Sequence, residues 1–89
     1  MKTLQQLNAP LLYEKSYIML TQFWPGALRS GTEALLEAIK LDPGNEKYKA
    51  FLKDAYNQLW KSRDLSGSDE ISVALRELRS RVKAAINEP

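Results

Sequence analysis

Apolar residues recur along this chain at spacings of three and four residues, which is the period of an α-helix. The most regular stripe falls within residues 46–63 and comprises Tyr48, Phe51, Leu52, Ala55, Tyr56 and Leu59. A second stripe falls within residues 69–86 and comprises Ile71, Leu75, Leu78, Val82 and Ala85. No segment shows the alternation of apolar and polar residues that a half-buried strand requires. The pattern therefore predicts an all-α fold, with Phe51 and Ile71 in the core.

Residues that break helices divide the chain into four segments, and we expect helices at about residues 10–24, 27–41, 46–63 and 69–86. Asn8 has the side chain of a helix cap, and Pro10 fits the first turn, where a missing N–H group costs nothing. Residues 1–8 are therefore expected to be frayed. Residues 9–89 are expected to form a single small domain, because a chain of 89 residues is too short for two cores.

Short capping and turn patterns set the boundaries between these helices. Ser30–Glu33 fits a capping box, so the second helix begins there, or it begins at Ala27 and carries Gly31 in its interior. Asp42–Asn45, with the sequence Asp-Pro-Gly-Asn, is the clearest turn in the chain. Ser68 is expected to cap the last helix, whose first turn then carries acidic residues at the positive end of the helix dipole.

The first predicted helix carries more apolar surface than one neighbouring helix can cover. Leu12, Met19 and Phe23 lie on one face, and Tyr13, Tyr17, Leu20 and Trp24 lie on the adjoining face. In an antiparallel four-helix bundle each helix needs one buried stripe, so a partner chain is expected to cover the excess. That partner is a different protein or a second copy. Trp24 and Trp60 lie at helix ends, where we expect large rings to be only partly covered and to anchor an interface.

Residues Ala34–Leu59 carry the pattern of a known family. Its elements are Ala38-Ile39, Leu41-Asp42-Pro43, Asn45, Leu52 and Ala55-Tyr56. In these positions the segment resembles the junction between two tetratricopeptide repeats (TPR), the second helix of one repeat and the first helix of the next. The resemblance implies a degenerate TPR-like helical array as the alternative to a bundle. It also implies a peptide groove on the outward side of the third helix, lined by Lys47, Ala50, Asp54, Asn57 and Gln58.

The composition argues against an enzyme. The chain contains no Cys and no His, which excludes disulfides, thiolate nucleophiles, Cys/His zinc sites and the usual acid–base group near neutral pH. No Gly-rich phosphate loop, nucleophile elbow or metal-ligand spacing occurs. Asp69-Glu70 is explained by the helix dipole rather than by catalysis. We therefore expect a non-enzymatic protein without cofactor or metal.

The formal net charge of +2 is too small to indicate a nucleic-acid-binding protein. Arg76, Arg79 and Lys83 share one helical stripe and form the candidate phosphate-binding site of that alternative. The most apolar stretch, residues 17–24, is far shorter than the roughly 20 residues of a membrane span. No signal peptide is recognised, and a cytoplasmic location is expected.

Together these patterns predict a protein–protein interaction module or adaptor, a small chaperone-like or TPR-like domain that binds a segment of a partner protein. The predicted contact residues are Tyr13, Tyr17, Leu20, Trp24 and Trp60, with Lys47, Asp54, Asn57 and Gln58 from the implied groove. A small helical-bundle inhibitor or immunity-type protein is the first alternative. Weak nucleic-acid binding through the basic last helix is the second.

Overall fold

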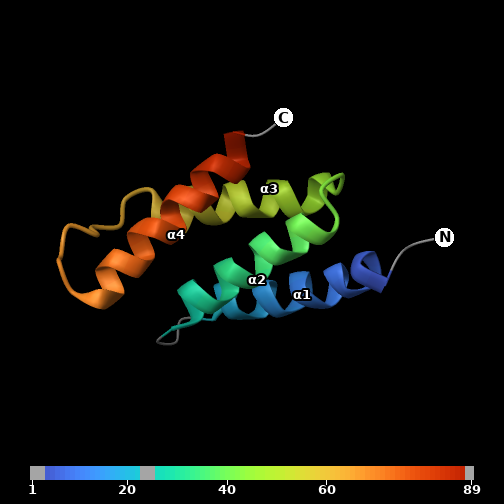
Figure 1. Cartoon of the computed structure of the whole chain (residues 1–89), viewed down its shortest axis with the longest axis horizontal. Helices are drawn as coiled ribbons and strands as arrows, with labels where there is room; N and C mark the ends of the chain where they lie inside the picture. Colours follow the sequence, from blue (N-terminus) through green and yellow to red (C-terminus); the bar gives the residue numbers. More distant parts are fainter. Residues whose placement is uncertain (1–3, 23–25, 88–89) are drawn as a thin grey trace.

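The structure, a computed structural model, describes residues 4–22 and 26–87, and α-helices make up most of these two ranges (Figure 1). The elements in chain order are α1 (Leu4–Thr21), α2 (Ala27–Leu41), α3 (Glu46–Ala55), the π-helical segment η1 (Tyr56–Trp60) and α4 (Glu70–Asn87). No strand occurs within the described ranges. The predicted all-α fold class is confirmed.

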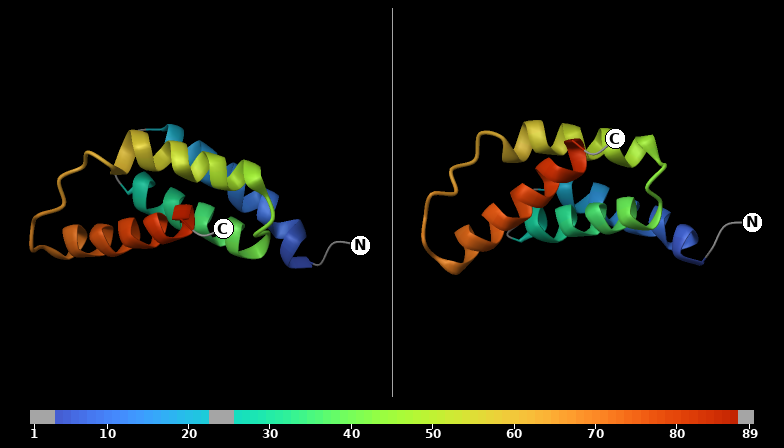
Figure 2. Two further views of the ribbon diagram at one scale, coloured as in Figure 1. Left: turned by 90° about the horizontal axis from the view of Figure 1, so that it is seen from above. Right: turned by 45° about the horizontal axis from the view of Figure 1, so that its top comes forward.

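The four α-helices of the described chain surround a shared apolar core. α1 and α2 run antiparallel, side by side, and α3 returns past them after the turn at residues 42–45 (Figure 1). α4 packs obliquely on α2, α3 and η1, as the two further views in Figure 2 show. The principal extents are 46 × 28 × 21 Å, so the molecule is elongated along the α1–α2 pair.

α1 and α2 approach each other closely at Gly31, which is buried in the contact. A Cβ atom on Gly31 would lie 2.9 Å from Cγ of Leu20 and 3.0 Å from Cβ of Met19. α2 begins at Ala27, directly after Gly26, whose φ of 83° is the left-handed conformation that glycine adopts freely. Of the two predicted starts, the one that places Gly31 inside the helix is therefore correct, and the capping-box start is wrong.

α1 differs from its prediction at both ends. It begins at Leu4, so Asn8 lies within the helix, and the predicted cap at Asn8 and start near residue 10 are wrong. Pro10 stands inside α1 rather than in its first turn, and without an N–H group it cannot donate to the carbonyl group four residues earlier. The helix ends at Thr21, three residues before the predicted end, and Trp24 lies outside the described residues.

α3 begins at Glu46, the predicted start, directly after the turn at residues 42–45, and Asn45 is its cap. The side-chain Oδ1 of Asn45 accepts hydrogen bonds from the backbone N–H groups of Lys47 (3.1 Å) and Tyr48 (3.4 Å). Tyr48, Leu52 and Ala55 are buried along its inner face. Phe51 is partly buried and packs against the main core, where its ring contacts Tyr13 and Tyr17 of α1, so it lies at the edge of the core rather than at its centre.

The predicted helix 46–63 becomes π-helical after Ala55. The backbone N–H of Lys61 donates to the carbonyl of Tyr56 at 2.8 Å, five residues earlier. This wider turn rotates the following side chains relative to an α-helix. Trp60, four residues after Tyr56 and so at the edge of the α-helical stripe, turns further inward as a result and is fully buried (0% exposed). The expectation that Trp60 is partly covered is therefore wrong.

Trp60 forms a second apolar cluster with Leu65 and Leu78. Its indole Nε1–H donates to Oγ1 of Thr32 on α2 at 3.2 Å, in a buried position. This bond satisfies the polar atom that a buried tryptophan brings into the core. Trp60 thus connects η1 to α2 and α4, and its role is structural.

α4 begins at Glu70, and its cap is Asp69 rather than the predicted Ser68. The Asp69 carboxylate accepts from the backbone N–H of Ser72 (3.1 Å) and from its hydroxyl (2.8 Å). These hydrogen bonds hold the pKa of Asp69 below its ordinary value. The first turn projects beyond the core, so Ile71 is 68% exposed and its predicted burial is wrong. Leu78 and Val82 are buried as predicted.

The contact at Gly31 predicts that alanine is destabilising there and tolerated at Gly44. Gly31→Ala should destabilise the fold by about 1–3 kcal/mol, because the added methyl group meets α1. Helix propensity alone would favour alanine by about 0.5–1 kcal/mol. A loss of unfolding free energy in the Gly31→Ala protein would therefore report the contact between the helices. Gly44→Ala is the control, since Gly44 has negative φ and a methyl group added there would meet no atom within 4 Å. Urea unfolding of both variants measures this, and a Gly31→Ala protein as stable as the wild type would contradict it.

The bond between Trp60 and Thr32 predicts a coupled pair. Thr32→Val leaves the indole N–H unpaired in the core and should cost about 1–3 kcal/mol. Trp60→Phe removes the donor and leaves the hydroxyl group behind. The double variant should be more stable than the sum of the single effects predicts, by about 0.5–1.5 kcal/mol. A double-mutant cycle by thermal or urea unfolding tests this, and strict additivity would show that the bond contributes nothing.

Candidate protein-binding surface

Large aromatic rings fill the space between α1 and α3. Tyr13 stacks on Tyr48 with ring centroids 4.9 Å apart and meets the edge of Phe51 at 5.5 Å. Tyr17 lies beside Phe51 at 5.5 Å and beside Tyr13 at 6.5 Å. Such ring pairs stabilise beyond the area they bury. We call these four residues the aromatic cluster. It holds the two helices together by side chains alone, without close contact between their backbones.

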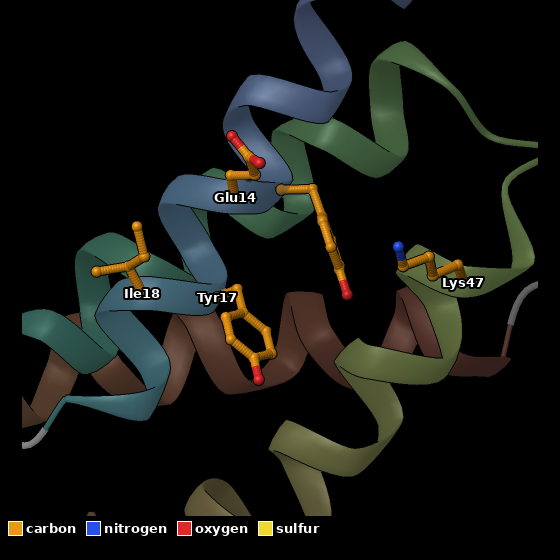
Figure 3. A pocket seen from close by; sticks show the side chains of 5 residues that line it. Glu14, Tyr17, Ile18 and Lys47 are labelled. Atoms are coloured by element: carbon orange, nitrogen blue, oxygen red, sulfur yellow. The ribbon is translucent and has the colours of Figure 1, made fainter.

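An open hollow of about 410 Å³ lies at the solvent side of this cluster. Its lining residues are Tyr13, Glu14, Tyr17, Ile18 and Lys47. In Figure 3, Glu14, Tyr17 and Ile18 project from α1, and Lys47 stands opposite them on α3. Tyr17 and Ile18 are each 51% exposed, so much of their surface faces solvent. We call this feature the aromatic hollow.

The charges around the aromatic hollow are sparse. Lys47 Nζ lies 5.1 Å from the centroid of the Tyr13 ring, within range of a cation–π interaction. Behind Tyr13, burial raises the pKa of the Tyr48 hydroxyl above its ordinary value, and the charge of Asp42 adds to this effect. Tyr48 therefore stays neutral over the physiological range. The hollow offers aromatic faces, one cation and one carboxylate, which suit an apolar side chain flanked by polar groups.

The described ranges contain neither metal-ligand groups nor membrane-spanning helices. No three acidic, His or Cys side chains gather there as metal ligands would. None of the helices in those ranges combines the length and apolar character needed to cross a membrane.

The structure brings together three of the predicted contact residues and separates the others. Tyr13, Tyr17 and Lys47 meet at the aromatic hollow. Leu20 is buried in the main core (7% exposed), because it packs against α2 at Gly31, so it is not available as a surface contact. The remaining residues of the implied groove, Ala50, Asp54, Asn57 and Gln58, are exposed on α3 and η1 outside the hollow.

Sequence reasoning missed the outward side of α1. Leu11 is 65% exposed, and Ile18 is 51% exposed and lines the hollow with Glu14. A signal was present, because Leu11 and Ile18 are seven residues apart and therefore share one side of a helix. That side is opposite the one that carries Leu20, so both stripes could not enter the same core.

The basic stripe of α4 forms hydrogen bonds with the loop that precedes the helix. Arg76 Nη1 donates to the carbonyl groups of Leu65 (2.5 Å) and Gly67 (2.6 Å), and Arg79 Nη1 donates to that of Arg63 (3.1 Å). Two of the three cations proposed to bind phosphate are thus engaged with backbone carbonyls, while Lys83 is exposed. This arrangement favours a structural role for the stripe over nucleic-acid binding.

A second hollow, of about 370 Å³, gathers cations from three helices. Lys40 of α2, Lys49 of α3 and Arg81 of α4 line it together with Leu36, Ile39, Pro43 and Ala85. Its cations are far apart in the sequence, so no local pattern could have identified it.

The hydrogen bonds of Arg76 predict that it restrains the loop at residues 61–69. Arg76→Gln should increase hydrogen exchange or broad-specificity proteolysis of this loop about tenfold, since a bond to a charged group contributes about 1.5 kcal/mol. Arg81→Gln removes an exposed cation from the same helix and serves as the control. Equal loop protection in the two variants would contradict the assignment.

Comparisons with protein-family models, with curated proteins and with solved structures find no match for this chain.

Proposed function

We propose that this chain is a non-enzymatic protein-binding module that receives a segment of a partner protein in the aromatic hollow. The observation that carries the proposal is the half-exposure of Tyr17 and Ile18 beside Tyr13 and Lys47 in one open concavity. Burying one large apolar side chain contributes about 1.5–3 kcal/mol, so a partner that covers this concavity gains a substantial part of its binding energy there.

The residue types of the hollow support this use. Tyrosine rings present an apolar face for packing and a hydroxyl group for water, so Tyr17 is compatible with both the free and the bound state. Lys47 and Glu14 add one charge of each sign at the rim. We therefore expect a segment with an apolar side chain in the hollow, an acidic group near Lys47 and a basic group near Glu14.

The exposed polar residues of α3 and η1 extend this surface. Lys47 and Asp54 lie two helical turns apart on one side of the helix, and Gln58 follows in η1. The TPR resemblance supports the same extension, because it implies a peptide groove along this helix. The inhibitor or immunity-type alternative uses the same kind of contact, with an enzyme as the partner.

A matched pair of surface substitutions tests the proposal. Tyr17→Ser should weaken capture of the partner from cell extract by at least tenfold, because an aromatic anchor is lost. Ile71→Ser is the control, since Ile71 is a large apolar residue, 68% exposed and on α4. Tyr17→Ser also removes two ring contacts of the aromatic cluster and should lower the melting temperature by several degrees, so circular dichroism must show that both variants are folded at the assay temperature. Partner capture by the Tyr17→Ser protein at wild-type strength would contradict the proposal.

A further inference from the structure

The side of α1 that faces away from the core carries two large apolar residues at its centre. Leu11 and Ile18 are 65% and 51% exposed, and nothing in the described part of the chain covers them. They are separated by two helical turns and so lie one above the other, about 10 Å apart. Glu14 and Lys15, both exposed, lie between them along the helix axis, on opposite sides of the line that joins Leu11 and Ile18. We call these four residues the outward stripe.

We propose that the outward stripe binds the same stripe of a second copy of this chain, with the two α1 helices parallel around a two-fold axis. In this arrangement Leu11 meets Leu11 of the second copy and Ile18 meets Ile18 of the second copy. Both pairs lie on the line where the helices touch. The two apolar contacts are two turns apart, which is half the density of apolar contacts in a coiled-coil seam, and Glu14 and Lys15 stand between them.

The charges select the parallel orientation and the identity of the partner. When parallel helices are related by a two-fold axis, opposite flanks face each other, so Glu14 meets Lys15 of the second copy, and Lys15 meets Glu14 of the second copy. In an antiparallel pair equal flanks face each other, and Glu14 would meet Glu14 while Lys15 would meet Lys15. The stripe is therefore complementary to itself in the parallel orientation alone. This self-complementarity favours a second copy over an unrelated partner.

The contact is small, so the dimer is expected to be weak. It offers two apolar contacts and two charge pairs, below the area of a standard stable interface. We expect a dissociation constant on the order of 100 µM. Glu14 and Ile18 belong both to the outward stripe and to the lining of the aromatic hollow, so the dimer and a partner in the hollow compete for these two residues. Tyr13, Tyr17 and Lys47 lie outside the outward stripe.

Single cysteines report the orientation directly, because the chain contains none. Leu11→Cys and Ile18→Cys, each on its own, should form a disulfide-linked dimer on mild oxidation, since each residue meets its own copy. Val73→Cys, at an exposed apolar position of α4, measures the rate of random collision. Cross-linking of each α1 variant at least tenfold faster than the Val73→Cys protein supports the proposal. Cross-linking only in a mixture of the two α1 variants would show an antiparallel pair and overturn it.

Charge reversal tests the partner. Glu14→Lys and Lys15→Glu each replace two opposite-charge contacts by like-charge contacts and should weaken the dimer at least tenfold in sedimentation velocity. The double variant exchanges the flanks and should restore it. All these residues are exposed, and circular dichroism checks that the variants stay folded. A wild-type monomer at millimolar concentration, or a double variant as weak as the singles, overturns the proposal. Partner capture is tested separately by Tyr17→Ser, because Tyr17 lies outside the outward stripe, whereas Glu14 lines the aromatic hollow as well.

Discussion

The close approach of α1 and α2 at Gly31 determines how the other surfaces of this molecule are used. The two helices touch there without room for a methyl group. Leu20 is therefore buried against α2 and is not available for any other contact. Because this face of α1 packs so closely on α2, the opposite side of α1 faces solvent. The exposed positions of Leu11 and Ile18 follow from this contact rather than from an error of patterning.

α1 meets its second neighbour by the opposite means. Toward α3 it uses large aromatic rings, which keep the backbones apart and pack by their edges and faces. These rings do not fill the space between α1 and α3 at the surface of the molecule. The unfilled space is the aromatic hollow. Tight packing on one side and wide packing on the other thus place a stable scaffold directly beside a surface suited to binding.

The sequence predicted those parts of the fold that depend on local chemistry. The turn at Asp42–Asn45 and the cap at Asn45 follow from side chains that bond to the nearest backbone, so their positions could be read in advance. Trp60 follows Tyr56 by four residues and so lies at the edge of the apolar stripe, but its full burial could not be predicted, because it depends on a π-helical turn that the apolar pattern does not show. Tyr13, Tyr17 and Lys47 were predicted as contacts, but only tertiary structure shows that they meet at one hollow.

The π-helical turn also makes chain length part of the information that this region carries. The π-helical turn holds about one residue more than an α-helical turn, so Trp60 keeps its direction only if this segment stays π-helical at its present length. Winding the same residues into an ordinary α-helix would point the indole away from Thr32 without altering a single core residue. Deleting one residue and restoring the α-helix together would leave the indole close to its present direction. Among related chains we would therefore expect either a π-helical segment of this length or an ordinary α-helix that is one residue shorter.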